Sequence, residues 1–316
     1  MTALVGIEPG EGCGWLKIMA KADIAALLAL GAAFFIAIGN VLHQRSAKEV
    51  TDEPVGNVAL FLRLLSDRQW WLGSLVAGLG FGLQAAALGL GSVLLVQALL
   101  VTALLFALPM NARATGERVT RTQWLWAALL AVSVAVVVTV GNPTPGHPRG
   151  VLQVWTSVIA IGAPALVLCT VGARLMSGKP AAAVLLGLVS GSLWGVFAVL
   201  TKGVVDRLSS VGDRGVSALL ADPELYVWAG VAVAATAFQQ ASFRAGSLAA
   251  SLPTMTVTEP VVASILGVLV LGETLRPGED GWVVLIAAAV VMAVATAALA
   301  RSEVRSTGAP AAAGVA

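Results

Sequence analysis

Long apolar runs separated by short polar segments fill the chain from about residue 22 to residue 300. A helix of about 20 apolar residues, rising 1.5 Å per residue, is long enough to cross the hydrocarbon core of a bilayer. By this criterion the pattern predicts nine membrane-spanning helices. We place them at about 22–44, 70–90, 92–110, 123–140, 150–173, 181–202, 224–244, 247–272 and 281–300. The fold class that we expect is therefore an all-α membrane protein.

The composition agrees with this expectation. Hydrophobic residues make up 58% of the 316 residues and charged residues only 11%, whereas a soluble domain of this length needs more polar surface. Cys13 and Cys169 predict no disulfide, and His43 and His147 are too far apart for a local metal or catalytic pattern. We expect no cofactor.

The segments outside the spans are short or low in complexity. Residues 1–21 form a glycine-rich leader, and no cleavage site follows the first apolar run, so we expect that run to be retained as a span. Either Met1 or Met19 can be the start of the chain. The amphipathic pieces 58–65 and 216–220 are expected at the membrane interface. Residues 301–316 are expected to form a disordered tail.

The two halves of the chain resemble each other at a spacing of about 155 residues. Such a repeated order of weak matches is the signature of an internal duplication. The matches pair Val55-Gly56-Asn57 with Val211-Gly212-Asp213, Trp71-x-Gly73 with Trp228-x-Gly230, Gln84 with Gln239, Gly91-Ser92 with Gly246-Ser247, Gly116-Glu117 with Gly272-Glu273, and Trp124 with Trp282.

An odd number of helices separates equivalent spans, so the two halves are expected to have opposite orientations. The predicted architecture is an inverted repeat, with spans 1–4 in a first repeat at 22–140, a connecting span within 141–180, and spans 6–9 in a second repeat at 181–300. Inverted repeats are typical of secondary transporters, whose sites lie near the bilayer midplane, although duplication alone does not establish transport.

Lysine and arginine are more frequent in the loops of one side, which includes Arg113, Arg118 and Arg121. The side richer in these residues is expected to be cytoplasmic, with the N-terminus outside and the C-terminus inside. We expect a multi-pass protein of the plasma membrane whose partners are the lipid bilayer and a small-molecule or cation substrate. A homodimer is one open assembly. No basic stripe indicates nucleic-acid binding.

The span at 247–272 contains the main candidate for a functional residue, Glu259. A carboxylate at the centre of a membrane helix costs about 2.5–3.5 kcal/mol on insertion scales, and it is rare there without a partner or a function. Pro260 removes a backbone donor and is expected to kink the helix and to free a carbonyl near Thr256. Pro253 marks a second expected helix break. The alternative is a protonated glutamate that bonds to a neighbouring helix.

Other polar side chains within the spans extend this candidate site. Gln84 and Gln239 occupy equivalent positions and are predicted to face a cavity between the repeats, with hydrogen bonding between helices as an equal alternative. A single carboxylate provides too few oxygen ligands for a divalent metal, so we assign no metal ligands. Arg45 and Lys202 end equivalent spans and are expected to snorkel to the interface. The predicted ligands of a substrate or coupling ion are Glu259, Thr256, Thr258, Gln84, Gln97, Gln239 and Gln240.

The run SLAASLPTMTVTEPVVASILGVLVLGETL, followed by a final span, resembles the second half of EamA-type members of the drug/metabolite transporter superfamily. The nine-span layout from about 24 to 300 is most similar to that of the NIPA-type magnesium transporters, as are Trp70-Trp71-Leu72-Gly73 and Gly191-Ser192. Two departures weaken the magnesium analogy: Ala98 replaces a proline of that family's motif, and its acidic residue in the second span is Gly82 or Leu83 here.

The resemblance and the residues together favour a secondary transporter that moves a small solute by alternating access. Glu259 is expected to be its proton-coupling or substrate-binding group. A NIPA-like magnesium or divalent-cation transporter is the alternative, and a non-transporting membrane subunit, in which Glu259 only locks helix packing, is a third hypothesis. We do not expect an enzyme, because Ser190-Gly191-Ser192 has no histidine in its own or the facing spans.

Overall fold

The structure is a computed structural model that describes residues 11–50, 68–115, 118–210, 220–245, 248–278 and 281–308. Within these ranges the regular elements are all helices, so the expected all-α class is confirmed. The only pairing of extended backbone there is an isolated bridge between Thr144 and Thr274. The helices are α1 (Glu11–Val50), α3 (Arg68–Leu90), α4 (Val93–Leu100), α5 (Ala103–Thr115), α6 (Arg121–Thr139), α7 (Leu152–Leu175), α8 (Pro180–Ser209), α10 (Pro223–Ala245), α11 (Leu248–Leu271) and α12 (Gly281–Gly308).

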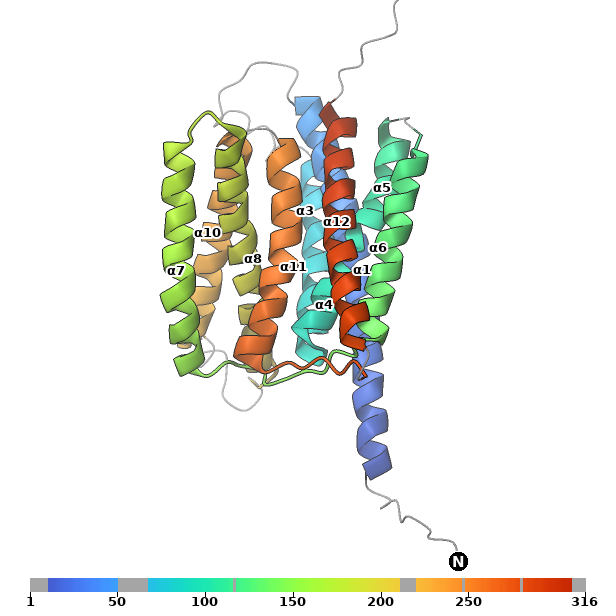
Figure 1. The fold of residues 1–316 in the computed structure, drawn as a ribbon, viewed down its shortest axis with the longest axis vertical. Coiled ribbons are helices and arrows are strands. Elements are labelled where there is room, and N and C mark those ends of the chain that lie inside the picture. The colour runs from blue at the N-terminus through green and yellow to red at the C-terminus, as the bar shows by residue number, and fades with distance from the viewer. Residues whose placement is uncertain are drawn as a thin grey trace, which may run out of the picture.

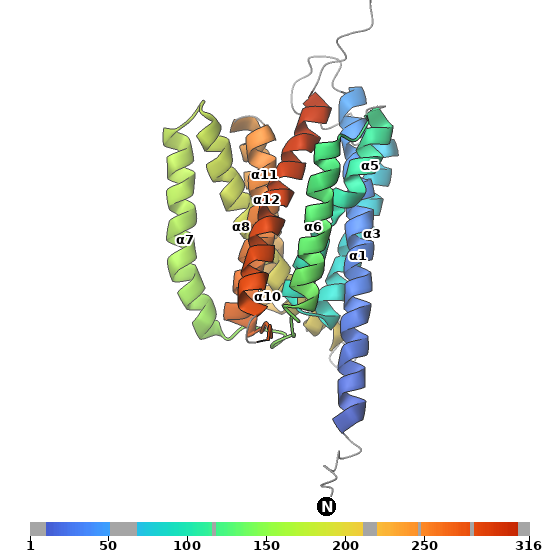
Figure 2. The same ribbon diagram turned by 45° about the vertical axis from the view of Figure 1, so that its right-hand side comes forward.

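The helices stand roughly side by side in one bundle, and successive spans run in opposite directions, with α4 and α5 together forming one span (Figure 1). We call one end of the bundle the lower end, where α3, α8 and α11 finish and α4, α10 and α12 begin. α1 packs on α3, α8 packs on both α10 and α11, and α12 packs on α6. α7 stands at the edge of the bundle in both views (Figures 1 and 2).

The chain is an integral, multi-pass membrane protein. Eight segments of its described part are long and apolar enough to cross a bilayer. The span expected at 224–244 is not one of them, because Gln239, Gln240 and Arg244 lower the hydropathy of α10, which nevertheless packs along α8. The eight segments are Lys21–Leu42, Trp71–Leu90, Val93–Arg113, Arg121–Thr139, Leu152–Leu175, Ala181–Ser209, Ser251–Leu271 and Gly281–Ser302.

Helix α11 is continuous from Leu248 to Leu271, so neither Pro253 nor Pro260 ends it, and the kink expected at Pro260 stays a prediction. Each proline removes a single backbone donor, and the neighbouring backbone hydrogen bonds keep the helix intact. The span expected at 92–110 is instead divided into α4 and α5 by a tight turn at 101–102.

The ends of the chain are more helical than expected. α1 already begins at Glu11, within the predicted leader, and α12 continues to Gly308, past residue 301 where the tail was expected to start. The amphipathic piece at 58–65 and most of the piece at 216–220 lie outside the described residues, as does the repeat marker Gly116-Glu117.

The buried core is built around α4, whose residues Val93 to Leu99 are all buried. Small and aliphatic side chains of α1, α3, α6, α8, α11 and α12 pack around it. The outer faces carry exposed apolar side chains, such as Leu152, Ile161 and Leu175 of α7. In a bilayer these side chains face lipid, which explains an apolar exterior around a core of small residues.

Candidate functional site

Glu259 lies at the middle of α11, where α11 packs on a row of glycines in α8. Gly187, Gly191 and Gly195 follow one another at intervals of four residues, so they lie on one face of α8. A Cβ atom at Gly195 would lie 2.9 Å from the backbone nitrogen of Ala263 and 3.0 Å from the carbonyl oxygen of Glu259. The two helix backbones therefore touch at the level of Glu259, as in small-residue packing of membrane helices.

The carboxylate of Glu259 has no partner within the described part of the chain. Its side chain is partly buried, and it forms neither a hydrogen bond nor an ion pair with any described residue. A carboxyl group at this depth is costly when ionised, and it needs a proton, a cation or a polar solute to offset that cost.

The threonines beside Glu259 hydrogen-bond to their own helix. The Thr256 hydroxyl donates to the carbonyls of Leu252, at 2.9 Å, and Pro253, at 3.2 Å. The Thr258 hydroxyl donates to the carbonyl of Thr254 at 2.7 Å. Their hydrogens are therefore committed, and only their oxygen lone pairs are available to a ligand.

The four glutamines predicted as ligands lie on three helices and differ in burial. Gln84 of α3 and Gln97 of α4 are buried, whereas Gln239 of α10 is half-buried and Gln240 is exposed. The Nε2 atom of Gln97 has no hydrogen-bond partner among the described residues. No hydrogen bond between described residues joins any of the four to Glu259, and their grouping into one site stays a prediction.

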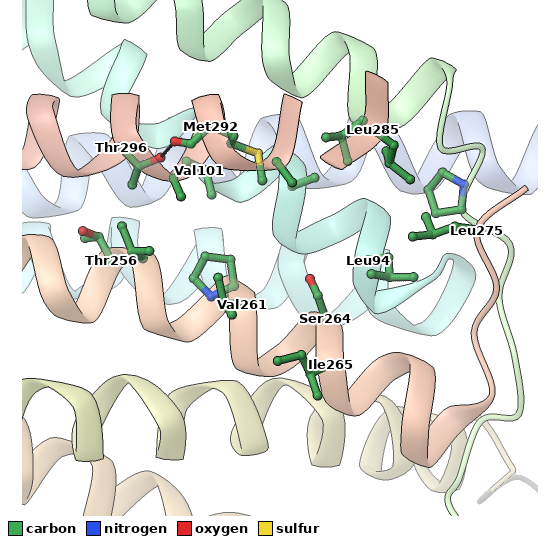
Figure 3. A pocket seen from close by; sticks show the side chains of 17 residues that line it. Leu94, Val101, Thr256, Val261, Ser264, Ile265, Leu275, Leu285, Met292 and Thr296 are labelled. Carbon is green, nitrogen blue, oxygen red and sulfur yellow. Dashed lines mark hydrogen bonds between the residues drawn. The ribbon is translucent and has the colours of Figure 1, made fainter. Parts of the chain in front are cut away.

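A pocket of about 270 Å³ lies on the other side of α11, between that helix, α4 and α12 (Figure 3). We call it the lateral pocket. Thr256 and Pro260 line it, together with Val261, Ser264 and Ile265 of the same helix. Glu259 is not among its lining residues. Glu259 and the pocket therefore lie on different faces of α11, whereas Thr256, another predicted ligand, lies on the pocket side.

An ion pair that the sequence did not predict lies inside the bundle near its lower end. The Nζ atom of Lys202, in α8, lies 2.7 Å from Oε1 of Glu273, just after α11. Only 5% of Lys202 and 1% of Glu273 are exposed. The prediction that Lys202 snorkels to the interface is wrong, because this carboxylate offers it a buried partner. The Gly272-Glu273 repeat marker was the signal in the sequence that pointed to this place.

Glu273 also caps the first turn of α4. Its two carboxylate oxygens accept hydrogen bonds from the backbone N–H groups of Val93, at 2.7 Å, and Leu94, at 3.0 Å. A negative charge at a helix N-terminus satisfies orphan donors and interacts favourably with the helix dipole. Gly272, at φ +65°, turns the chain so that this side chain points inward. One carboxylate thus joins α4, α8 and the end of α11.

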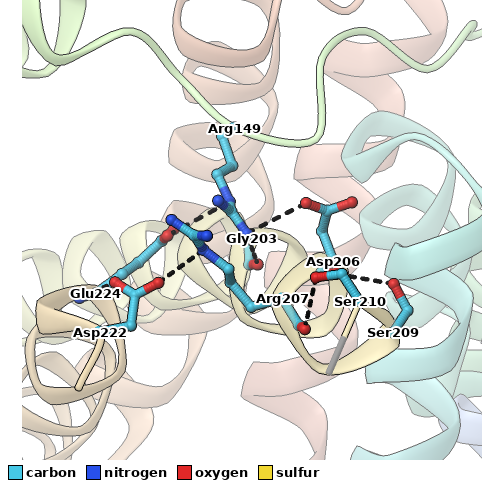
Figure 4. Close-up of polar contacts among 8 residues, drawn as sticks. All are labelled: Arg149, Gly203, Asp206, Arg207, Ser209, Ser210, Asp222 and Glu224. Carbon is cyan, nitrogen blue, oxygen red and sulfur yellow. Dashed lines mark hydrogen bonds and ion pairs between the residues drawn. The ribbon is translucent and has the colours of Figure 1, made fainter. Parts of the chain in front are cut away.

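A second set of charged contacts lies beside this pair, at the same end of α8 (Figure 4). Arg149 lies 3.2 Å from Asp206 and 3.6 Å from Glu224, and its Nη2 atom donates to the carbonyl of Gly203 at 3.4 Å. Another ion pair joins Arg207 of α8 to Asp222, before α10, at 2.7 Å. These contacts tie α8, α10 and the segment before α7 together at the lower end.

Aromatic side chains link the first and second halves of the chain above these charged pairs. Phe197 of α8 stacks on Phe81 of α3 and on Trp228 of α10, with ring centroids 5.5 and 5.1 Å apart. The indole N–H of Trp228 donates to the Thr201 hydroxyl at 2.9 Å. The ring of Trp194 meets Phe197 edge-on. Trp228 thus packs on α8, whereas Trp194 contacts a ring of its own helix.

Within the described ranges, no three side chains of histidine, cysteine, aspartate or glutamate gather in a way that would hold a metal ion. Lone carboxylates such as Glu259 offer fewer oxygens than the six to eight that Ca²⁺ takes, or the several ligands and waters of Mg²⁺. The metal-binding alternative gains no geometric support from this part of the chain.

The chain is similar to an uncharacterised protein of Corynebacterium glutamicum. The two are 38% identical over 285 residues, which cover 90% of this chain and 97% of the relative. No family model matches the chain, and no solved structure matches it. The relative's name assigns no activity, so function has to be argued from the residues and their geometry.

Proposed function

We propose that this chain, which belongs to the same family as the corynebacterial protein, is a secondary transporter that moves a small solute by alternating access. In this proposal Glu259 is the proton-coupling or substrate-binding group. The protein belongs in the plasma membrane, with its N-terminus outside and its C-terminus inside.

The observation that carries the proposal is the contrast between two glutamates, one at the middle of α11 and one just after its end. The charge of Glu273 is paired with that of Lys202, and its carboxylate accepts two backbone hydrogen bonds, so these contacts account for its presence as a structural residue. Glu259 has no partner among the described residues, although it lies at the middle of a membrane helix. A group in that position can take up and release a proton or bind a polar solute at little structural cost.

The arrangement of helices supports an inverted repeat as the basis of the transport cycle. α1 packs on α3 in the first half, and their proposed equivalents α8 and α10 pack on each other in the second. The equivalent helices α6 and α12 pack together, as expected near a pseudo-two-fold axis. α7, whose single buried residue is Ala173, would be the connector.

Alternating access requires one end to open while the other closes. At the lower end, Lys202 pairs with Glu273 and Arg149 pairs with Asp206, and in this proposal these ion pairs hold that end closed. With the N-terminus outside, this end faces the exterior. The glycine contact between α8 and α11 lets the two helices shift along each other with little steric obstruction. In this proposal the shift exposes Glu259 to the two ends of the bundle in turn.

The proposal is tested in proteoliposomes after ligand screening. The melting temperature of purified protein is first measured with amino acids, sugars, hydrophobic cations or Mg²⁺. A ligand at 100 times its dissociation constant adds about 2.7 kcal/mol of stability and therefore raises the melting temperature. Uptake of the stabilising compound is then driven by a pH gradient. We expect Glu259→Gln to abolish gradient-driven uptake while the protein stays folded, and the control Asp23→Asn, at an exposed acid of α1, to retain it.

Three outcomes would contradict the proposal. Gradient-driven uptake that is unchanged in Glu259→Gln would remove the proton role of this residue. Stabilisation by Mg²⁺ alone would favour the NIPA-like divalent-cation transporter. Finally, the absence of any stabilising solute, combined with a large loss of stability in Glu259→Ala, would favour a non-transporting membrane subunit.

A further inference from the structure

The lateral pocket opens at the middle of the membrane. On α11 its edge is formed by Val261 and Ile265, which are 46% and 51% exposed. Val261 lies at the centre of the apolar segment Ser251–Leu271. On α12 the exposed Ala289 faces the same opening, near the centre of its own apolar segment. At this depth only lipid hydrocarbon surrounds the protein, so whatever enters the pocket laterally comes from the acyl-chain region.

The lining of the pocket is suited to hydrocarbon. No charged residue contributes to it, and its floor is formed by Leu94 and Ala98 of the buried helix α4. The hydroxyl of Thr296 donates to the carbonyl of Met292, and that of Thr256 donates within α11. The Ser264 hydroxyl makes no hydrogen bond to a described residue and is the one polar group there with a free hydrogen.

The volume is large enough for part of a lipid chain. An engineered apolar cavity of about 150 Å³ stays dry and takes up benzene, whereas the lateral pocket measures about 270 Å³. Water gains little in it because water needs two to four polar partners. An acyl chain fills the space with dispersion contacts and does not have to cross water to reach it.

We propose that the lateral pocket is a binding site for an acyl chain of a bilayer lipid, which enters between α11 and α12 and reaches α4. This inference does not depend on Glu259, which lies outside the pocket lining. It therefore holds for a transporter and for a non-transporting membrane protein alike.

The experiment uses the full-length protein in liposomes that contain a phospholipid with a diazirine at the middle of one acyl chain. After illumination, labelled peptides are identified by mass spectrometry. Lipid that merely surrounds the protein can label Val261 or Ile265, but it cannot reach the buried residues Val93 to Leu99 of α4. We expect label on α4, at Leu94 or Ala98, in the wild-type protein.

A matched pair of variants locates the entrance. Ala289→Trp places an indole at the opening, and Ala287→Trp places one at an exposed position of the same helix that does not line the pocket. We expect the α4 label to fall at least fivefold in Ala289→Trp and to be unchanged in Ala287→Trp. Absence of label on α4 in the wild-type protein, with normal labelling of the exposed faces, overturns the proposal even if a variant fails to fold. Equal α4 labelling in the two variants also overturns it.

Discussion

Replacing Lys202 by methionine should destabilise the protein strongly, because it leaves Glu273 buried without a counter-charge. Glu273 is almost fully enclosed, and without Lys202 the partners that its carboxylate keeps among the described residues are the N–H groups of Val93 and Leu94. Removing one partner of a buried ion pair typically costs about 3–5 kcal/mol, since the remaining charge is not solvated. At about 2–4 °C per kcal/mol for a chain of this order of size, the melting temperature should fall by roughly 6–20 °C.

The double variant distinguishes the loss of stability due to the broken ion pair from the loss due to altered packing. In Lys202→Met combined with Glu273→Gln, no buried charge remains, so the protein should be more stable than Lys202→Met alone. The coupling between the two sites should be at least about 2 kcal/mol. Lys179→Met is the matched control, because Lys179 is an exposed lysine at the other end of the same helix, and its melting temperature should not change.

The measurement is the thermal unfolding of purified protein in one detergent, with five proteins prepared in parallel: the wild type, Lys202→Met, Glu273→Gln, the double variant and Lys179→Met. Additive effects of Lys202→Met and Glu273→Gln would refute the reasoning, since independent residues show no coupling. A Lys202→Met protein as stable as the wild type would refute it as well, because it would mean that the carboxylate is solvated or neutralised by another group.

Two further predictions concern helix packing and the charged contacts at the lower end. Gly195→Ala should lower the melting temperature clearly, because the new Cβ would lie 2.9 Å from the backbone of α11. The control Gly230→Ala, in α10, places a Cβ that meets no atom within 4 Å, so it should be neutral or slightly stabilising. Equal effects of the two substitutions would contradict the close approach of α8 and α11. Arg149→Ala removes ion pairs with Asp206 and Glu224 that are partly exposed, so it should cost only about 1 kcal/mol, and the loss should shrink in 1 M salt. A salt-independent loss would show that packing of the arginine, not its charge, matters.

The positions of the helices were predictable because the signal is local. An apolar run of about 20 residues has few alternatives to a membrane helix, and the predicted spans match the observed helices within a few residues at most ends. The division of α4 from α5 was not predictable, because no glycine or proline marks residues 101–102. Conversely, two prolines suggested a break in α11, but the helix continues through both of them.

The candidate site was predicted in part. Glu259 stood out because an acid within an apolar run is rare, and the structure leaves it without a partner among the described residues. The role of Lys202 was missed because its partner is 71 residues away in the chain, and nothing in the local pattern relates the two. The lateral pocket could not be foreseen either, since it depends on which faces of α4, α11 and α12 meet.

The cap on α4 has a consequence for the synthesis of the protein. The carboxylate that closes the N-terminus of α4 is added 180 residues after Val93, the residue that it caps. At about 5–20 residues per second, the ribosome needs roughly 10–40 s to supply it. During that time the N–H groups of Val93 and Leu94 cannot reach their final acceptor. The first turn of α4 therefore completes its hydrogen bonding only after Glu273 has been synthesised. In a nascent chain that stops before Glu273, the Ser92 hydroxyl still accepts from the N–H of Leu95, but the N–H groups of Val93 and Leu94 lack their final acceptor.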